Sequence, residues 1–324
     1  MNSSIKNTLS CPLCGNPNKL IEDSIDTHEL KNIWQEQTAH LTESVDISRI
    51  SDITTKIDYH KCSKCDLGFF NPQIPGDNQF YGDLAQDSLY YLHEGKSEFD
   101  YSTELITKGS CVLDVGSGRG IFSKYLDSSI DYTGLELSSE AVQLAKEDQI
   151  NVLNMTIEDF AKTTQKKFDF IVSFQVLEHI EDIESFMNSI KKLLKEDGKI
   201  IFAVPNNQSF IRKTPNHILN LPPHHLLHWN NQSLTFLASH FNLKVKDIFC
   251  ERLSNTHLRA YLYSLTYDFI RRILFMPYRQ IRESFVRNLI SKISWKFASI
   301  AASINSNLFK NKLGQTIIIL MQKK

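Results

Sequence analysis

A strand followed at once by a glycine-rich turn constrains this fold more than any other feature. Residues 110–126 read SCVLDVGSGRGIFSKYL, an apolar strand pattern, then Gly116, Gly118 and Gly120, then a helical pattern. Glycines at such a turn let backbone N–H groups approach a ligand closely. We therefore expect a strand, a ligand-binding turn and a helix.

The following segments repeat this alternation of strand and helix. DYTGLELS reads as a second strand ending in Glu136, about 20 residues after Gly116, where an acid can accept hydrogen bonds from both ribose hydroxyls. SSEAVQLAKE reads as an N-capped helix, and INVLNM, FDFIVSF and GKIIFAVPN read as further strands. TIIILMQKK reads as a last strand. The alternation predicts an α/β, doubly wound sheet with its ligand at the carboxyl ends of the strands.

The glycine spacing distinguishes between two nucleotide cofactors. A dinucleotide turn of the form G-x-G-x-x-G needs a glycine at position 121, which is Ile121 here. Asp114, just before the glycines, suits a cationic amino acid group better than a pyrophosphate. These residues favour S-adenosylmethionine over NAD.

Two C-x-x-C pairs indicate a metal site near the N-terminus. Cys11 and Cys14 form one pair, and Cys62 and Cys65 the other. Four thiolates complete a tetrahedral zinc site, and a site closed by four cysteines is structural and not catalytic. The gap between the pairs is long for a zinc ribbon, so we expect a helical insertion over residues 21–58 around ELKNIWQEQTAHL.

Four motifs together resemble the class I S-adenosylmethionine-dependent methyltransferases. They are VLDVGSGRGIF, TGLELS, TIEDF and FDFIVSFQVLEHIED, in the usual order and spacing. The segment from CPLC to HKCSKCDLGFFNPQ is similar to the zinc-binding leader of some bacterial members, which include sugar C-methyltransferases and proteins of surface-glycan gene clusters.

The resemblance implies a domain organisation. A seven-stranded Rossmann-like methyltransferase sheet would occupy residues 81–251 and 314–324. A zinc-ribbon module would occupy 1–80, and a basic helical insertion would occupy 252–313, before the last strand.

The resemblance also implies roles for single residues in binding S-adenosylmethionine. Asp114 would orient the amino group, Glu136 would hold the ribose and Leu137 would flank the adenine. The backbone of Gly116, Ser117, Gly118 and Gly120 would face the methionine part, Thr156, Ile157 and Glu158 would read the adenine edge, and Ser173, Phe174 and Gln175 would lie beneath the sulfonium. Ordinary loop solvation is the alternative for Thr156 and Glu158.

A histidine-rich stretch, LPPHHLLHWNNQSL, follows the fifth strand. In the sugar C-methyltransferases a Glu-His pair lies here, and it falls on His224 and His225, with His in place of Glu. His225 is therefore a candidate general base, with His179 in VLEHIED, at the start of the helix after the fourth strand, as a second candidate. The alternatives are packing with Trp229, or a metal site that adds His228, which we expect to fail because adjacent histidines on an extended loop point apart.

The basic insertion combines helical apolar spacing with positive charge. Residues 252–313 hold eleven Lys and Arg against only Asp268 and Glu283, and Pro277 is expected to divide two helices. Four interpretations stay open: an amphipathic surface for anionic lipid, a lid that grips a phosphate-bearing substrate, a dimer interface, or a solvated helical cap. The membrane interpretation would place the protein at the inner membrane face.

The sequence predicts an enzyme that transfers a methyl group to a sugar or other small anionic acceptor in glycan biosynthesis, with the acceptor nucleotide- or lipid-linked. An O-methyltransferase acting on a quinone-like phenol, an RNA methyltransferase and a non-catalytic cofactor-binding scaffold are the alternatives. Residues 1–251 hold more Asp and Glu than Lys and Arg, which makes a poor surface for a phosphate backbone. The fourth strand ends Ser-Phe-Gln-Val and lacks the pattern Asn/Asp-Pro-Pro-Tyr/Phe, which also argues against nucleic acid. The N-terminus lacks a signal-peptide pattern, so a cytoplasmic protein is expected.

Overall fold

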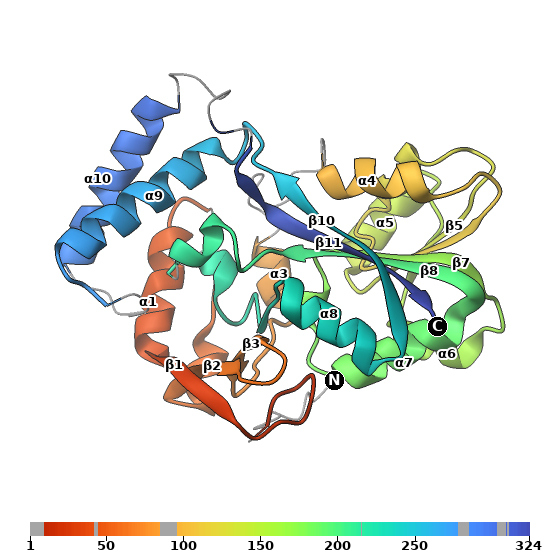
Figure 1. The fold of residues 1–324 in the computed structure, drawn as a ribbon, viewed down its shortest axis with the longest axis horizontal. Coiled ribbons are helices and arrows are strands. Elements are labelled where there is room, and N and C mark those ends of the chain that lie inside the picture. Colours follow the sequence, from red (N-terminus) through yellow and green to blue (C-terminus); the bar gives the residue numbers. More distant parts are fainter. Residues whose placement is uncertain are drawn as a thin grey trace. The chain divides into compact units, whose positions relative to one another are not determined.

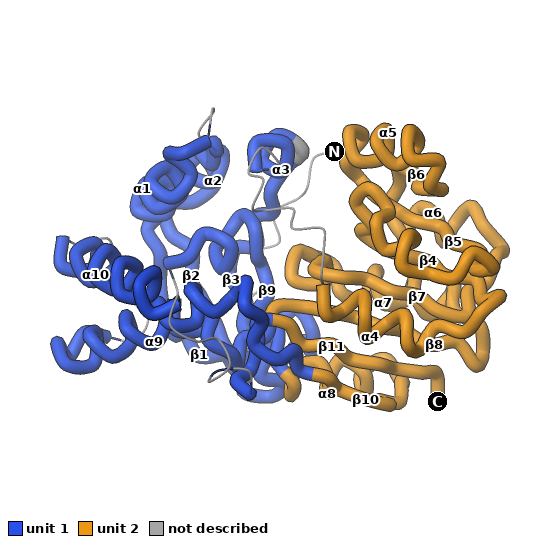
Figure 2. Tube along the Cα trace, turned by 90° about the horizontal axis from the view of Figure 1, so that it is seen from above, with its two compact units in different colours: residues 1–91, 206–230, 250–315 blue, residues 92–205, 231–249, 316–324 orange. Residues whose placement is uncertain are grey.

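The computed structural model describes residues 10–41, 45–84, 96–214, 216–277, 285–302, 309 and 311–324. The chain divides into two compact units (Figure 2). Unit 1 holds residues 1–91, 206–230 and 250–315, and unit 2 holds 92–205, 231–249 and 316–324. By this division, residues 206–230 and the basic insertion group with the cysteine module.

Unit 2 is built on a seven-stranded sheet in the order β10-β11-β8-β7-β4-β5-β6 (Figure 1). The strands are β4 (Cys111–Val115), β5 (Asp131–Glu136), β6 (Val152–Asn154), β7 (Phe168–Phe174), β8 (Leu194–Pro205), β10 (Leu243–Arg252) and β11 (Leu313–Lys323). The neighbouring strands β6, β5, β4, β7 and β8 run parallel, and β11 is antiparallel to β8. The predicted doubly wound, seven-stranded sheet is confirmed.

The order of the strands fixes where a ligand can bind. β4 is first in the chain among these strands, with β5 on one side and β7 on the other. The chain order reverses there, and ligands bind beyond the carboxyl ends of strands at such a switch point. Val112 and Leu113 of β4 are fully buried, so the strand that carries the glycine turn is anchored in the core.

The helices of unit 2 are α4 (Ser97–Leu105), α5 (Ser139–Glu147), α6 (Ile157–Thr163), α7 (Ile183–Leu193) and α8 (Asn231–His240). Side-chain caps start α5, α6 and α7. The hydroxyl of Ser138 accepts a hydrogen bond from the N–H of Ala141 at 3.1 Å, so the predicted capped helix is confirmed. The carboxylate of Asp182 caps α7 in the same way.

Two local expectations in unit 2 were wrong. The segment after the glycines is a five-residue 3₁₀ helix, η1 (Ile121–Tyr125), because it starts from the left-handed Gly120 and closes short i→i+3 bonds. His179 does not start the helix after β7. It ends the short 3₁₀ helix η2 (Leu177–His179), and the cap at Asp182 sets the start of α7 instead.

Unit 1 contains a four-stranded sheet in the order β1-β2-β3-β9. The strands are β1 (Lys19–Asp26), β2 (Lys56–Cys62), β3 (Gly68–Asn71) and β9 (Leu227–His228). α1 (Thr27–Gln37) and α2 (Ser48–Ile53) lie between β1 and β2 in the chain, so the predicted insertion is helical inside while its ends form an antiparallel strand pair. α3 (Asn78–Leu84) follows β3.

The core of this sheet reaches across distant parts of the chain. Trp34 of α1 is fully buried, and its indole N–H donates to the carbonyl oxygen of Pro222 at 2.9 Å. β9 pairs antiparallel with β3, Gly68 opposite His228. The short 3₁₀ helices η3 (Phe210–Lys213) and η4 (Ile218–Asn220) lie between β8 and β9 in the chain.

The basic insertion forms two helices, α9 (Leu258–Ile273) and α10 (Phe285–Ala301), on either side of Pro277 as expected. They lie side by side in Figures 1 and 2 and share a core with Phe210 of η3. Among the helices of the described ranges, none is long and apolar enough to cross a bilayer.

Candidate cofactor site, histidine connection and metal centre

The glycine turn after β4 is held in a conformation that side chains resist. Gly116, Gly118 and Gly120 have φ angles of +75°, +53° and +71°. A Cβ added to Gly116 would lie 2.3 Å from Cγ2 of Val176, whereas one added to Gly118 would meet no atom within 4 Å. The backbone at Gly118 therefore borders open space, as a turn that approaches a ligand must.

Glu136 links the end of β5 to this turn. Its Oε2 accepts a hydrogen bond from the N–H of Gly118 at 2.9 Å. Its Oε1 accepts from the N–H groups of Leu137 at 2.7 Å and Ser138 at 2.8 Å. The carboxylate is thus fixed at the carboxyl edge of the sheet, beside the open face of Gly118, with lone-pair capacity left on Oε2 for a ligand hydroxyl.

Asp114 is a buried acid directly before the turn. It is 2% exposed, and its Oδ2 accepts a hydrogen bond from the hydroxyl of Tyr132 at 2.8 Å. Burial raises the pKa of Asp114 to about 7, against the lowering effect of the Tyr132 hydrogen bond. A cationic ligand group would stabilise the ionised carboxylate, so the site suits an ammonium.

The remaining predicted contacts fall into two groups. Leu137 is 58% exposed, an apolar surface available beside Glu136, and Glu158 is half-buried in the first turn of α6. Thr156 has a structural task, because its hydroxyl caps α6 by accepting from the N–H of Asp159, and Ile157 is buried. Thr156 is therefore a helix cap and not a solvated loop residue.

The end of β7 is also partly structural. Ser173 donates through its hydroxyl to the carbonyl oxygen of Val115 at 2.9 Å, which joins β7 to β4. Phe174 packs against the rings of Phe99 and Phe122. Gln175, which follows β7, has a φ of +58°, and its amide nitrogen lies 3.5 Å from Oε1 of Glu98.

Sequence reasoning missed two residues here. Tyr132 lies two and four positions before Gly134 and Glu136, so strand alternation places all three on one face of β5, and that signal was available. Glu98 is buried in the first turn of α4 and has no such signal.

The histidine connection, which we define as residues 206–230 between β8 and α8, belongs to unit 1. Nδ1 of His228 lies 3.1 Å from the hydroxyl of Tyr59, and Nε2 lies 2.9 Å from the carbonyl oxygen of Asn220, so this ring ties β9 to β2 and to η4. Trp229 is fully buried. These two residues match the packing interpretation of the stretch.

His224 and His225 lie together, contrary to our expectation. The N–H groups of both residues donate to the carbonyl oxygen of Leu221, so the chain turns there and is not extended. The two rings are 4.4 Å apart between centroids, and both residues are buried. Nδ1 of His224 lies 3.3 Å from the carbonyl oxygen of Leu219, which can only accept and so assigns the proton to Nδ1.

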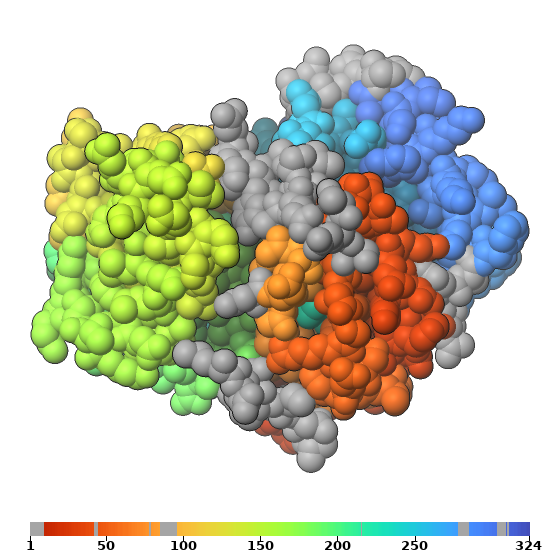
Figure 3. Space-filling model, turned by 180° about the vertical axis from the view of Figure 1, so that it is seen from behind, coloured from red at the N-terminus to blue at the C-terminus, as the bar shows by residue number. Residues whose placement is uncertain are grey.

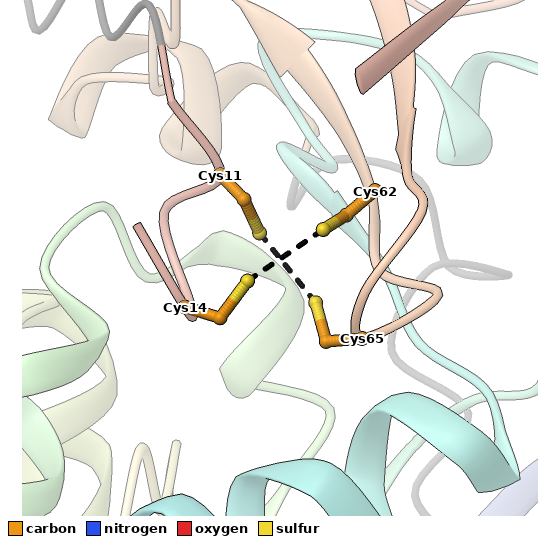
Figure 4. A group of neighbouring side chains, drawn as sticks. All are labelled: Cys11, Cys14, Cys62 and Cys65. Carbon is orange, nitrogen blue, oxygen red and sulfur yellow. Dashed lines mark hydrogen bonds between the residues drawn. The ribbon is translucent and has the colours of Figure 1, made fainter. Parts of the chain in front are cut away.

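The four cysteines converge as predicted (Figure 4). Sγ of Cys11 lies 3.5 Å from Sγ of Cys65, and Sγ of Cys14 lies 3.6 Å from Sγ of Cys62. Tetrahedral zinc with Zn–S bonds of about 2.3 Å separates its sulfurs by about 3.8 Å, so the spacing fits this metal.

The two cysteine turns share one backbone design. The N–H of Gly15 donates to the carbonyl oxygen of Cys11, and the N–H of Asp66 donates to that of Cys62. Both Gly15 and Asp66 are left-handed. The N–H of Lys64 points to Sγ of Cys62 at 3.4 Å, the kind of donor that stabilises a metal-bound thiolate.

Comparison with known proteins agrees with this geometry. Residues 92–248 match a family described as "Methyltransferase domain". A ubiquinone biosynthesis O-methyltransferase of Glaesserella parasuis is 30% identical over 185 residues, which cover 48% of this chain and 78% of that protein. The chain belongs to the class I S-adenosylmethionine-dependent methyltransferases.

Other matches of this methyltransferase are shorter or more distant. A ubiquinone biosynthesis O-methyltransferase of Actinobacillus pleuropneumoniae is 35% identical over 109 residues, 30% of this chain and 47% of that protein. The chain thus spans about half the length of this relative. A crystal structure of coclaurine N-methyltransferase bound to N-methylheliamine and S-adenosylhomocysteine has a TM-score of 0.42 and 15% identity, over 69% of this chain and 71% of that one.

Proposed function

We propose that this methyltransferase methylates a hydroxyl of a sugar or another small anionic acceptor in glycan biosynthesis. One observation carries the proposal. The four cysteines form a cluster, and this cluster belongs to the same unit as the histidine connection. The cluster supports the resemblance of residues 1–80 to the leader of glycan-cluster methyltransferases. The matched methyltransferase family spans residues 92–248, so this module is an addition to the common domain.

The residues around the glycine turn fit S-adenosylmethionine. Asp114 would accept hydrogen bonds from its amino group, Glu136 from its ribose hydroxyls, and Leu137 would cover one adenine face. When bound, S-adenosylmethionine supplies a methyl group already activated by its sulfonium. The chain therefore needs mainly to position the acceptor and to exclude water.

His225 is the proposed general base for the acceptor hydroxyl. A base is needed because a sugar hydroxyl attacks carbon far better as it loses its proton. Beside it, at 4.4 Å between ring centroids, the His224 ring is held by the Leu219 carbonyl oxygen. Two imidazolium charges at this separation would repel each other, which favours a pair that carries at most one positive charge.

Binding and turnover test the proposal separately. Calorimetric titration should show micromolar S-adenosylmethionine binding that collapses in Glu136→Ala. S-adenosylhomocysteine formation should then appear with a nucleotide-sugar pool as acceptor and fall about 100-fold in His225→Asn, with donor affinity unchanged. His240→Asn, on α8, is the matched control. Donor binding without turnover on any acceptor would favour the scaffold, and an unaltered rate in His225→Asn would remove the base.

A phenolic acceptor is the second candidate function. It is supported by the curated relatives, which are named ubiquinone biosynthesis O-methyltransferases. A catechol-type phenol tested beside the nucleotide sugars separates the two, because the faster acceptor identifies the chemical class. Turnover of the phenol alone would replace the glycan proposal.

We also propose that the four cysteines bind structural zinc. All four sulfurs are within 4.8 Å of one another, and a closed thiolate set leaves no coordination position for substrate. Mass spectrometry under native conditions should find one zinc per chain, and Cys65→Ser should lose it. Cys250→Ser, outside the cluster, should retain it.

A further inference from the structure

We propose that α9 and α10 form a docking surface for an anionic lipid bilayer. The surface consists of the outward face of α10 with the end of α9. It is independent of the acceptor proposed above, because it concerns where the protein binds and not what it methylates.

The outward face of α10 is apolar where a solvated helix would be polar. Phe285, Leu289, Ile293 and Ile300 are 83%, 49%, 49% and 60% exposed. Their spacing of four and seven residues places them on one stripe of the helix. Phe275, just beyond α9, is 94% exposed. An apolar stripe of this extent marks an interaction surface.

The opposite face of α10 already has its packing partners. Ile290, Ser294 and Ala298 recur at four-residue spacing and are 3%, 0% and 0% exposed. Trp295 contacts the Tyr263 ring of α9 edge-on, and the guanidinium of Arg259 lies over the Trp295 ring at 4.5 Å. The exposed stripe is therefore not the face that folds α10 onto its own unit. In Figure 3 the blue residues of the helix pair lie at the surface of this unit.

Charge decides between a membrane and a second copy of the chain. α10 carries Arg287, Lys292 and Lys296 and no acidic residue. On α9 the only acid, Asp268, is bound by Arg271 at 2.6 Å and by Arg272 at 3.1 Å. A symmetric dimer through this stripe would bring the lysines of two copies together, which is unfavourable.

An anionic bilayer satisfies both properties of the surface. Lys292 and Lys296 are exposed and flank the stripe. Apolar side chains can enter the interface while lysines beside them pair with lipid phosphates, as in other amphipathic helices that lie in the membrane plane.

Vesicle binding by the full, zinc-replete protein tests the proposal. We expect co-sedimentation with vesicles of phosphatidylcholine containing one-third phosphatidylglycerol at low salt, and much weaker binding to phosphatidylcholine alone. Lys292→Gln/Lys296→Gln should weaken binding at least tenfold, and Leu289→Gln/Ile293→Gln should do the same. Leu20→Gln/Ile21→Gln is the matched control, because these β1 side chains are 64% and 61% exposed but lie outside the surface.

Three results would overturn the proposal. The first is no binding of folded, cofactor-binding protein to the anionic vesicles at low salt. The second is undiminished binding by both variants. The third is self-association in sedimentation velocity that the Leu289→Gln/Ile293→Gln change abolishes while vesicles are ignored, which would assign the surface to a second copy.

Discussion

Asp114 and Glu136 are two acids at one edge of a sheet, and their surroundings give them different tasks. Glu136 receives three backbone N–H groups, which hold it as an acceptor. Asp114 receives one hydroxyl and is otherwise buried, which penalises its charge. The first is therefore arranged for neutral hydroxyl groups and the second for a cation.

The raised pKa of Asp114 predicts pH-dependent donor binding. Because its folded pKa is about 7 and the unfolded value is about 4, Asp114 makes the free protein lose stability progressively as pH rises from about 4 to about 7. A bound ammonium favours the ionised form. S-adenosylmethionine affinity should therefore rise more than tenfold between about pH 5.5 and 7.5, because a free α-amino group, with a pKa of about 7.7–8.0, is still mostly protonated at the upper value.

Calorimetry at the two pH values measures this effect. Asp114→Asn should bind weakly at both, with no pH dependence from this site. Equal wild-type affinities at pH 5.5 and 7.5 would show that Asp114 does not meet the amino group.

Gly118 predicts a loss of binding larger than the loss of stability. An alanine there keeps a left-handed φ of +53° and places its Cβ in open space, so unfolding free energy should fall by only about 1–2 kcal/mol. Donor affinity should fall at least tenfold, because the methyl group occupies the side from which the ligand approaches. Thermal unfolding and titration measure the two quantities.

Gly109→Ala is the matched control for Gly118. Gly109 also has a positive φ, +75°, and open space around its Cβ, but it precedes β4. It should lose similar stability and retain donor affinity. Equal affinity losses in both variants would mean that the turn is disturbed only through the fold.

At the scale of elements, the second cysteine turn determines the position of β9. Cys62 ends β2 and Gly68 begins β3, so residues 63–67, which include Cys65, join the two strands. β3 in turn carries β9, through Gly68 opposite His228 and the N–H of Phe70 donating to Leu226 at 3.0 Å. The four-cysteine cluster thus supports the segment that ends in the histidine connection.

Removal of the proposed zinc should loosen that segment. A chelator, or Cys62→Ser, takes away the bond that fixes the turn between β2 and β3, and β9 then loses its partner. Hydrogen exchange in peptides covering 224–229 should become faster by a factor of ten or more, while β4 and β7 keep their protection. Cys111→Ser serves as the thiol control, and unchanged exchange after chelation would separate the cluster from β9.

At the scale of the whole molecule, each unit is discontinuous in sequence but has its own core. Trp34, Tyr59 and Phe70 centre the core of unit 1, and Phe122, Val172 and Ile201 belong to that of unit 2. The proposed zinc ligands lie in the first unit and the proposed donor ligands in the second. Each ligand should therefore stabilise a different part of the chain.

Calorimetric unfolding should show two transitions. Chelation should lower the midpoint of one, and S-adenosylmethionine should raise the midpoint of the other, by about 2.7 kcal/mol of stabilisation at a hundredfold excess over its dissociation constant. Glu136→Ala should remove only the second response. A single transition that responds equally to both ligands would show that the units unfold as one.

Local patterns in the sequence were enough to predict the sheet, the glycine turn and the cysteine cluster. Strand patterns, the glycines at 116–120 and paired cysteines are local signals. Residues this close in sequence keep their positions relative to one another, however the distant parts of the chain fold. The same logic failed for His179, because a cap at Asp182 competed with the helical pattern.

Other features depend on contacts between residues that are distant in the sequence, and these features emerged only from the folded structure. It brought His224 and His225 to 4.4 Å by a turn that the sequence did not reveal, and it tied His228 to Tyr59 across the sheet of unit 1. Asp114 is buried beside Tyr132, and this burial raises the pKa of Asp114. Contacts with the rest of unit 1 determine which face of α10 is buried. Burial and charge separation are properties of the folded arrangement, so no pattern along the chain could supply them.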